Sequence, residues 1–368
     1  MQFQEMLRKM VMERASDLLI KVGVPPSIRV DGKIYFFQSD PLTPQDVQDM
    51  YKQIEESKRE GFKGATELDT AYEFPGVGRF RVNIFRQRGY LGMVFRHVES
   101  QIPTFEDLNL PLDQLQKLAT RQRGLILITG VTGSGKSTTL AAMLNYINSN
   151  FNKHIVTIED PIEFVFKDKK CIIDQREVGV DTESFGLALK YVVRQSPDVI
   201  LIGEMRDRET MEAAISAAET GHLVLSTLHT VNAQQTVERI INFFPPHQHQ
   251  LIRLQLAMIL EGVISQRLIA RKGKKGRVPA VELMMRSPTM REVLMDGETE
   301  ELYKVLKEGE YFGSMTFNQS LKRLYETGLI SLEDAMSASD NPDEFKLELK
   351  GIVKGGFSSD FNFDMKKK

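Results

Sequence analysis

The chain has 368 residues, with 48 Lys and Arg against 50 Asp and Glu, and a formal net charge of −2. Hydrophobic residues make up 41% and charged residues 27%, which is typical of soluble globular proteins and excludes a globally disordered chain. The near-neutral total gives no global reason to expect a nucleic-acid or acidic-membrane binder, and the length predicts roughly two or three domains.

The single cysteine, Cys171, excludes an intramolecular disulfide and a Cys-rich structural zinc site. Charged residues interrupt the first ten positions, where a signal peptide needs a continuous apolar stretch. No segment approaches the roughly 18 uninterrupted apolar residues of a membrane span. We therefore expect a soluble, cytoplasmic protein.

The first part of the chain combines one helical pattern with several extended ones. Apolar residues recur at helical spacing over 3–11. Asp31-Gly32-Lys33 lies between Ile28-Arg29-Val30 and Ile34-Tyr35-Phe36 and predicts a hairpin, because Gly readily takes a positive φ. Polar and apolar residues alternate over 79–84, and 90–98 is a suitable hairpin partner for that strand. These elements predict a small α+β domain over residues 1–100.

Beyond a predicted linker at 101–112, the pattern changes to short apolar runs separated by helical stretches. Runs that are apolar on both faces predict a buried, mainly parallel sheet and therefore an α/β domain, which we place at 113–286. The region 287–354 is predicted to be mostly helical, and the Gly/Ser/Lys-rich end, 355–368, to be poorly ordered. The apolar runs are 125–128, 155–158, 199–202 and 223–225.

A P-loop pattern, G-x-x-x-x-G-K-[ST], begins at Gly130 and lies between a predicted strand and a predicted helix. Glycines let backbone N–H groups close around phosphate oxygens, and the helix N-terminus adds its positive end. We expect Lys136 to reach the β- and γ-phosphates of ATP and the Ser137 hydroxyl to ligate Mg²⁺. A Gly-rich turn without a ligand is the alternative. The predicted nucleotide-binding residues are Gly130, Thr132, Gly133, Ser134, Gly135, Lys136, Ser137 and Thr138.

Two acidic stretches follow predicted strands. Glu204 follows the apolar run 199–202 and is predicted to organise Mg²⁺ through a water, whereas Asp198 lies at the start of that run. The stretch Glu159-Asp160-Pro161-Ile162-Glu163 crowds three carboxylates into five residues, so one of them is a candidate general base. The residues alone do not choose among the three, and a solvated acidic turn is the alternative.

His222 and His229 lie at the two ends of one apolar run. Ligands of open α/β sheets bind at the carboxyl ends of strands, which favours His229 as a sensor of the γ-phosphate. His222 is predicted at the opposite end, where it suits a subunit boundary. A purely structural histidine is the alternative for each.

Arginines are dense in the first predicted domain, and guanidinium groups recognise phosphate and stabilise charge in phosphoryl transfer. They would reach the P-loop across a domain cleft or from a neighbouring subunit, and a solvated strand face is the alternative. The basic run 271–277 lacks aromatic residues and contains two glycines, so we predict a solvated turn between a helix and a strand. The arginines are Arg79, Arg81, Arg86, Arg88 and Arg96.

Taken together, these motifs resemble the secretion-type hexameric ATPases, in particular the type IV pilus retraction ATPases of the PilT/PilU type. The resemblance covers roughly residues 1–340. It implies a PAS-like N-terminal domain, a RecA-like ATPase core and a helical C-terminal region, assembled as a ring of six. The matching segments are 130–139, 157–163 (the aspartate box), 203–207 (Walker B) and 219–230 (the histidine box).

The resemblance also implies roles for individual residues. By position it makes Glu163 the general base among the three carboxylates and Glu204 the organiser of the metal and water. Arg81 and Arg96 match the arginines that the family uses to reach the γ-phosphate. The implied catalytic set is Glu163, Glu204, Arg81, Arg96, His229 and His222, and the implied metal-binding residues are Ser137 and Glu204.

The function implied by the resemblance is that of a motor that hydrolyses ATP, with Mg²⁺, to power pilus retraction and twitching motility. The implied partners are further copies of the chain, an inner-membrane pilus platform protein and a second retraction ATPase, with no nucleic acid. The implied location is the cytoplasmic face of the inner membrane. The stretch 287–294 departs from the principal retraction enzymes, and 315–321 and 331–338 are nearer the accessory, PilU-like branch. An accessory ATP-binding partner and a RecA-like nucleic-acid translocase are the alternative functions.

Overall fold

The computed structural model of the protein describes residues 2–30, 32–55, 67–98 and 101–350. The chain divides into two compact units. One unit is Met1–Thr104 with Ala141–Glu204, and the other is Phe105–Leu140 with Met205–Lys368. The predicted domain boundaries at residues 100, 112, 286 and 354 stay a prediction, and the predicted poorly ordered tail, 355–368, lies outside the described residues.

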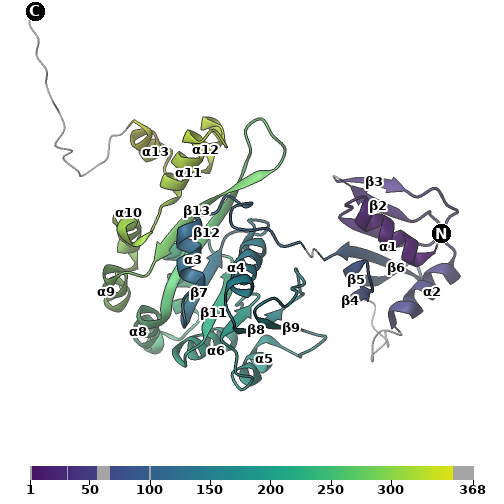
Figure 1. Cartoon of the computed structure of the whole chain (residues 1–368), viewed down its shortest axis with the longest axis horizontal. Coiled ribbons are helices and arrows are strands. Elements are labelled where there is room, and N and C mark those ends of the chain that lie inside the picture. Colours follow the sequence, from purple (N-terminus) through teal and green to yellow (C-terminus); the bar gives the residue numbers. More distant parts are fainter. Residues whose placement is uncertain (1, 31, 56–66, 99–100, 351–368) are drawn as a thin grey trace, which may run out of the picture. The chain divides into compact units, whose positions relative to one another are not determined.

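The first strands of the chain form an antiparallel sheet that shares a hydrophobic core with two helices (Figure 1). The elements are α1 Phe3–Met12, β1 Asp17–Lys21, β2 Ser27–Val30, β3 Lys33–Phe36, α2 Pro44–Glu55, β4 Glu67–Phe74, β5 Gly78–Gln87 and β6 Tyr90–His97. The strand order is β3-β2-β1-β6-β5-β4, and every neighbouring pair is antiparallel.

The polar and apolar alternation of β5 gives this sheet one buried face and one polar face. Phe80 and Val82 are fully buried, whereas Arg81 between them is exposed, as the alternation predicts. The helical spacing of α1 turns residues such as Leu7 into the same core. The predicted hairpin is confirmed by the pairing of β2 with β3; its turn residue Asp31 lies outside the described residues.

The middle of the chain builds a seven-stranded sheet in the order β13-β12-β7-β11-β10-β8-β9. Its elements are α3 Leu112–Ala119, β7 Gly124–Thr129, α4 Lys136–Asn150, β8 His154–Glu159, β9 Ile172–Glu177, α5 Phe185–Val192, β10 Val199–Ile202, α6 Arg208–Glu219, β11 Leu223–Leu228, α7 Ala233–Asn242, η1 Pro246–Gln248, α8 His249–Ile259, β12 Leu260–Ala270 and β13 Arg277–Met285. The pairs β7–β11, β7–β12, β8–β10 and β8–β9 are parallel, whereas β13 pairs with β12 in the antiparallel direction.

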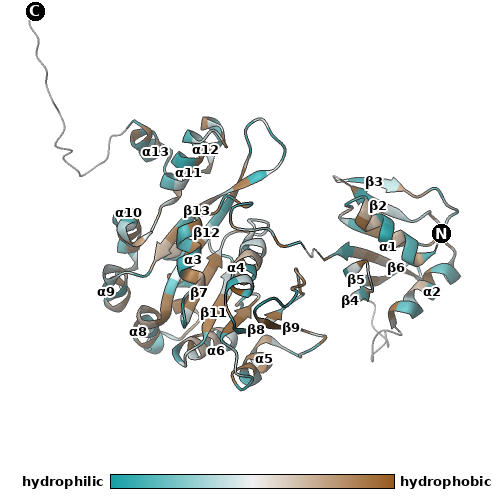
Figure 2. Ribbon diagram, in the orientation of Figure 1, coloured by the Kyte–Doolittle hydropathy of each residue, from teal (hydrophilic) through white to brown (hydrophobic). Residues whose placement is uncertain are grey.

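The four predicted apolar runs are the strands β7, β8, β10 and β11. Every residue of β7 and β11 is buried, and Figure 2 shows their predominantly hydrophobic character. This is the pattern of a parallel sheet covered on both faces. The mixed α/β architecture predicted from the sequence is therefore confirmed.

The prediction for the basic run 271–277 was wrong about the element before it. The run joins two strands, β12 and β13, and not a helix and a strand. The reason is that α8 passes directly into β12 at Leu260, whose backbone is already extended, without a Gly or Pro to mark the change. Six of the seven residues of the run, from Lys272 to Arg277, are exposed.

The last described part of the chain is helical, as predicted. Its elements are α9 Pro288–Asp296, η2 Thr299–Glu301, α10 Leu302–Glu308, η3 Gly309–Phe312, α11 Phe317–Glu326, α12 Leu332–Ala338 and α13 Pro342–Leu349. Ser331 begins α12 as the sequence indicates, because its hydroxyl accepts the backbone N–H of Asp334 at 3.0 Å. Phe317 and Phe345 are buried in a hydrophobic cluster that joins these helices to β12 and β13.

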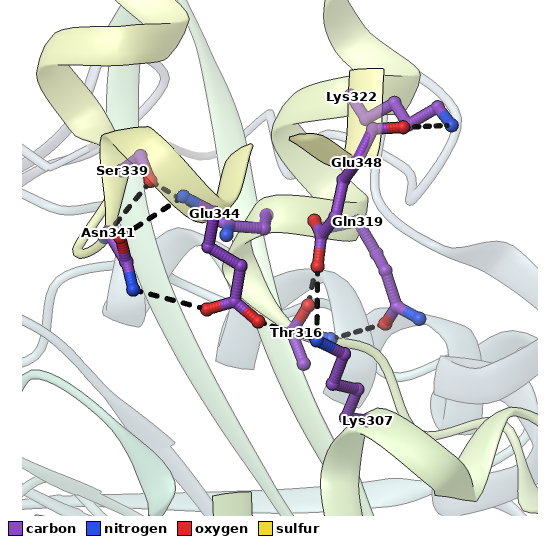
Figure 3. A network of polar contacts seen from close by, with 9 residues as sticks. Lys307, Thr316, Gln319, Lys322, Ser339, Asn341, Glu344 and Glu348 are labelled. Atoms are coloured by element: carbon purple, nitrogen blue, oxygen red, sulfur yellow. Dashed lines mark hydrogen bonds and ion pairs between the residues drawn. The ribbon is translucent and has the colours of Figure 1, made fainter. Parts of the chain in front are cut away.

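A polar network reinforces this helical region (Figure 3). The Lys307 ammonium of α10 donates to Glu344 of α13 at 2.5 Å and lies 3.5 Å from the carboxylate of Glu348. Hydrogen bonding to Glu344 raises the pKa of Lys307, so the ammonium stays charged. Lys322 of α11 donates to the backbone oxygen of Glu348 at 3.1 Å. Residues from three helices are thus joined by charge as well as by apolar packing.

Candidate nucleotide-binding site

The P-loop follows β7 and leads into the first turn of the 15-residue helix α4. Gly130, Gly133 and Gly135 all have positive φ, of 146°, 78° and 91°. A Cβ on Gly130 would collide with the Ser134 hydroxyl and would lie 2.6 Å from the backbone oxygen of Gln266. Only glycine fits there, so the loop has the tight backbone path that a phosphate cradle requires.

The side chains of the loop fit a nucleotide phosphate. Lys136 is buried, and its ammonium donates to the backbone oxygens of Gly130 at 2.8 Å and Val131 at 3.2 Å. The buried hydroxyl of Ser134 has no hydrogen-bond partner among the described residues. Ser137 lies on the first turn of α4, where its hydroxyl is a hard oxygen ligand of the kind that Mg²⁺ takes. The remaining predicted residues of the loop are Thr132, which is exposed, and Thr138, which is half-buried.

Strand β12 makes hydrogen bonds to residues on both sides of the P-loop. The sequence analysis did not predict these contacts. The Thr129 hydroxyl donates to Ser265 at 2.9 Å, and the Gln266 amide donates to the Thr139 hydroxyl at 2.8 Å. All four side chains are buried. The signal in the sequence was the polar pair Ser265-Gln266, which follows the apolar Val263-Ile264.

Among the three crowded carboxylates, the structure separates one buried group from two exposed ones. Glu159 is the last residue of β8 and is 8% exposed, whereas Asp160 and Glu163 are exposed. The Glu159 carboxylate accepts the Thr157 hydroxyl at 2.7 Å, the Gln175 amide at 3.2 Å and the backbone N–H of Glu163 at 3.4 Å. Burial outweighs these hydrogen bonds and raises the pKa of Glu159 to about 7.

Strand β9 holds the loop that carries Glu163. Gln175 donates to the backbone oxygen of Phe164 at 2.8 Å and accepts the backbone N–H of Phe166 at 2.9 Å. Glu177 accepts the backbone N–H of Ile162 at 3.3 Å. These residues were missed from the sequence because β9 is a mostly polar strand without an apolar run.

Glu204 follows β10 by two residues and is half-buried. The preceding Gly203 donates its backbone N–H to the oxygen of Ile158 at 2.8 Å, and a Cβ on Gly203 would lie 3.4 Å from the Cα of Glu159. The structure therefore brings the segments of Glu204 and Glu163 together at the carboxyl ends of β8 and β10. Asp198 lies at the other end of β10 and accepts the backbone N–H of His154 at 2.8 Å, which is a structural role.

The two histidines lie at opposite ends of β11, as their positions in the sequence predict. Leu228 is paired with Thr129 of β7, so His229 follows beside the first residue of the P-loop. His222 lies seven residues earlier, roughly 23 Å away along an extended strand. The His222 Nδ1 atom is 2.9 Å from the backbone oxygen of Ala217 in α6. Of the two, only His229 is near the P-loop of its own chain.

Arg81 and Arg96 come together on the polar face of the first sheet, where they are directly paired across β5 and β6. Asp17 of β1 is the next residue of this row, and its carboxylate accepts Arg96 Nε at 3.1 Å and Nη2 at 2.8 Å. Arg29 lies on the other side, 3.4 Å from the same carboxylate. Asp17 is buried and offsets the repulsion between like charges, a role that the sequence analysis missed.

Within the described ranges, no group of three or more His, Cys, Asp or Glu side chains is arranged to hold a metal ion. In the same residues, no helix is both long enough and apolar enough to cross a membrane.

Comparisons with known proteins agree with this geometry. A family model described as type II/IV secretion system protein matches residues 93–336. The chain is 44% identical to the type IV pilus ATPase PilU of Pseudomonas aeruginosa, over 95% of this chain and 92% of that protein. It is 43% identical to the type IV pilus retractation ATPase PilT of the same organism, over 94% of this chain and 100% of that protein. The crystal structure of the pilus retraction motor PilT with bound ADP matches with a TM-score of 0.86 at 45% identity, over 94% of this chain and 98% of that one.

Proposed function

The chain belongs to the type II/IV secretion system protein family and is an ATPase, and from this premise we propose that it works as a hexameric motor for type IV pilus retraction. The observation that carries the proposal is the match over 94% of the chain, and over 98% of its counterpart, to a pilus retraction motor. This match extends over both sheets, and a shared ATPase core alone would not give it. We place the motor at the cytoplasmic face of the inner membrane.

We propose that Lys136 and Ser137 hold the phosphates and Mg²⁺ of ATP, with the glycine loop supplying backbone N–H groups. When bound, ATP would supply the electrophilic γ-phosphorus, and Mg²⁺ would neutralise negative charge on the leaving group. Glu163 accepts the proton of the attacking water, and Glu204 orients water at the metal. The exposure of Glu163 supports this assignment, because a general base must meet water, whereas Glu159 is buried beneath it.

The histidines and the arginines have different roles in the proposed mechanism. His229 senses the γ-phosphate, which its place beside Gly130 supports. His222, at the far end of β11, serves a boundary between copies of the chain. Arg81 and Arg96 reach the γ-phosphate as charge-stabilising groups, and their adjacent register lets them act as a pair.

We propose that the chain keeps the domain plan predicted from the sequence, with a PAS-like domain over 1–100, a linker over 101–112, the ATPase core over 113–286 and a helical region over 287–354. Its proposed partners are five further copies, an inner-membrane platform protein and a second retraction ATPase. An accessory role beside that second ATPase is the other candidate, and the 44% identity to PilU favours it. ATP hydrolysis by the purified chain alone separates an independent motor from an accessory one.

The proposal is tested by deleting the gene, counting surface pili and scoring twitching motility. We expect excess pili and lost motility, and the same result when the deletion is complemented with Lys136→Ala. Complementation with the wild-type chain is the control. Absent pili would point to a role in assembly and would overturn the proposal.

A further inference from the structure

A buried carboxylate lies under the start of α7, directly after the His229 loop. Glu282 of β13 is 4% exposed, and its Oε1 atom accepts the backbone N–H of Ala233 at 2.7 Å. Ala233 is the first residue of α7, whose unpaired N–H groups and positive dipole end favour a negative partner. An apolar side chain would fill this place without the desolvation cost, so packing does not account for a glutamate here.

Register places Glu282 in one row with the P-loop strand. Glu282 is paired with Ser265 of β12, and Ser265 is paired with Thr129, the last residue of β7. Thr129 is in turn paired with Leu228, the residue before His229. Cross-strand partners point to the same face of a sheet, and the Thr129 and Ser265 hydroxyls are 2.9 Å apart. A buried polar row therefore runs from Glu282 to the base of the P-loop.

The segment between His229 and α7 is fixed at several points. The Thr230 and Thr236 hydroxyls are 2.7 Å apart, and the Thr236 hydroxyl donates to the backbone oxygen of Asn232 at 2.7 Å. The Asn232 side chain accepts the backbone N–H of Gln235 at 2.8 Å and so caps the helix. These bonds tie the loop to α7, and the Glu282 carboxylate ties the start of α7 to the sheet.

We propose that Glu282 is a positioning residue of the ATPase site, which fixes the start of α7 and thereby holds His229 beside the P-loop. This inference rests on the proposed role of His229. The groups that face Glu282 are Arg267 of β12, Asp340 before α13, Tyr303 of α10 and the N-terminus of α7. Burial is the main cause that raises the pKa of Glu282 to about 7, and Asp340 adds to it.

The test compares Glu282→Ala, Glu282→Gln and, as a matched control, Glu238→Gln, which removes a carboxylate from the middle of the same helix. We expect Glu282→Ala to lower kcat by roughly tenfold or more, because a small misplacement of a reacting geometry is costly. The affinity for a fluorescent ADP analogue should stay within about twofold, since the P-loop contacts are intact. Glu282→Gln keeps an acceptor oxygen and should restore kcat to within about threefold of wild type. Wild-type kcat in Glu282→Ala overturns the proposal.

Hydrogen exchange gives a readout that does not depend on activity. Amides over 230–236 should exchange faster in Glu282→Ala than in the wild type or in Glu238→Gln. Unchanged exchange overturns the proposal even if kcat falls. If His229→Ala hydrolyses ATP normally, the role of His229 fails, whereas the exchange result still reports on the Glu282 contact.

A pH profile covers the case in which the Ala variant does not fold. The ratio of wild-type to Glu282→Gln kcat should stay within about threefold between about pH 6 and 8, because Gln offers the same acceptor oxygen as either protonation state of the glutamate. Ionisation of Glu159 is common to both proteins and cancels in the ratio. A ratio that changes by more than about threefold over this range contradicts the proposal, because Gln would then fail to replace the acceptor oxygen that positions α7.

Discussion

The Oε2 atom of Glu159 accepts the backbone N–H of Glu163 at 3.4 Å, so the buried carboxylate at the end of β8 holds the exposed carboxylate that follows it. The two carboxylates have opposite environments although they are only four positions apart in the sequence. Glu159 is buried and hydrogen-bonded on both oxygens, whereas Glu163 is exposed to solvent. A buried residue that fixes the backbone of an exposed carboxylate is a suitable arrangement for a proton acceptor, because it limits the movement of that acceptor.

Glu163→Gln should abolish ATP hydrolysis and leave ATP binding intact. The amide cannot accept the proton of water, which should lower kcat by roughly 10²-fold or more. Steady-state hydrolysis and equilibrium binding of an ATP analogue are the measurements. Asp160→Asn is the matched control, because Asp160 is also exposed on this loop and should tolerate the change. Equal losses in the two variants would remove the special role of Glu163.

Glu159→Gln should stabilise the protein at alkaline pH more than at acidic pH. Its folded pKa of about 7 lies above the ordinary 4.5, so the folded state retains a proton that the unfolded state loses. The wild-type free energy of unfolding therefore falls as pH rises from about 4.5 to 7. Between about pH 5.5 and 8 the free-energy cost of this group grows by roughly 2 kcal/mol, and Gln avoids that growth.

The measurement is the melting temperature of both proteins across this pH range. Glu282 has a raised pKa too, but it is present in both proteins, so its contribution cancels in the difference. A difference between variant and wild type that is independent of pH would show that Glu159 does not ionise over this range in the folded protein.

Gly130→Ala should damage nucleotide binding far more than Gly133→Ala. A Cβ at Gly130 meets the Ser134 hydroxyl and the Gln266 backbone, whereas a Cβ at Gly133 has no atom within 4 Å. Both positions have positive φ, so each variant carries backbone strain of about 1 kcal/mol, but only Gly130 adds a collision. We expect ATP affinity to fall roughly tenfold or more for Gly130→Ala alone. Titration with a fluorescent nucleotide measures the affinity of each variant. Similar losses of affinity in both would mean that backbone strain, and not the collision of the Cβ, weakens nucleotide binding.

Arg96→Ala should lower the ATPase rate, and Arg29→Ala should not. Both arginines flank the carboxylate of Asp17, so either change removes one of its partners and the structural cost is comparable. Only Arg96 is paired with Arg81 in the adjacent strand. An arginine that stabilises transition-state charge contributes roughly 10³-fold to kcat, and the loss should appear in kcat with nucleotide affinity preserved. A slow Arg29→Ala enzyme would instead assign the effect to the fold of the sheet.

Most of the fold could be predicted from local signals. The four apolar runs became β7, β8, β10 and β11, and the alternation over 79–84 became β5, because side-chain period and strand type are short-range properties. The strands that were missed lacked such a signal. Strand β9 is polar, and β12 continues α8 without a break.

The sequence by itself determined the P-loop pattern that predicts the phosphate site, since Gly130, Lys136 and Ser137 lie within eight residues. It also determined that the two histidines lie at opposite ends of one strand, because an extended chain fixes their separation. Neither conclusion needs a distant part of the chain.

Tertiary structure alone decided which of the crowded carboxylates is buried, and which partners support the site. Asp17 meets Arg96 across 79 residues, Ser265 meets Thr129 across 136, and Glu282 meets Ala233 across 49. Such contacts follow from strand order and register, which bring remote residues into one row. A hydrogen bond of about 3 Å between remote residues depends on this long-range placement. The sequence around either partner does not encode it.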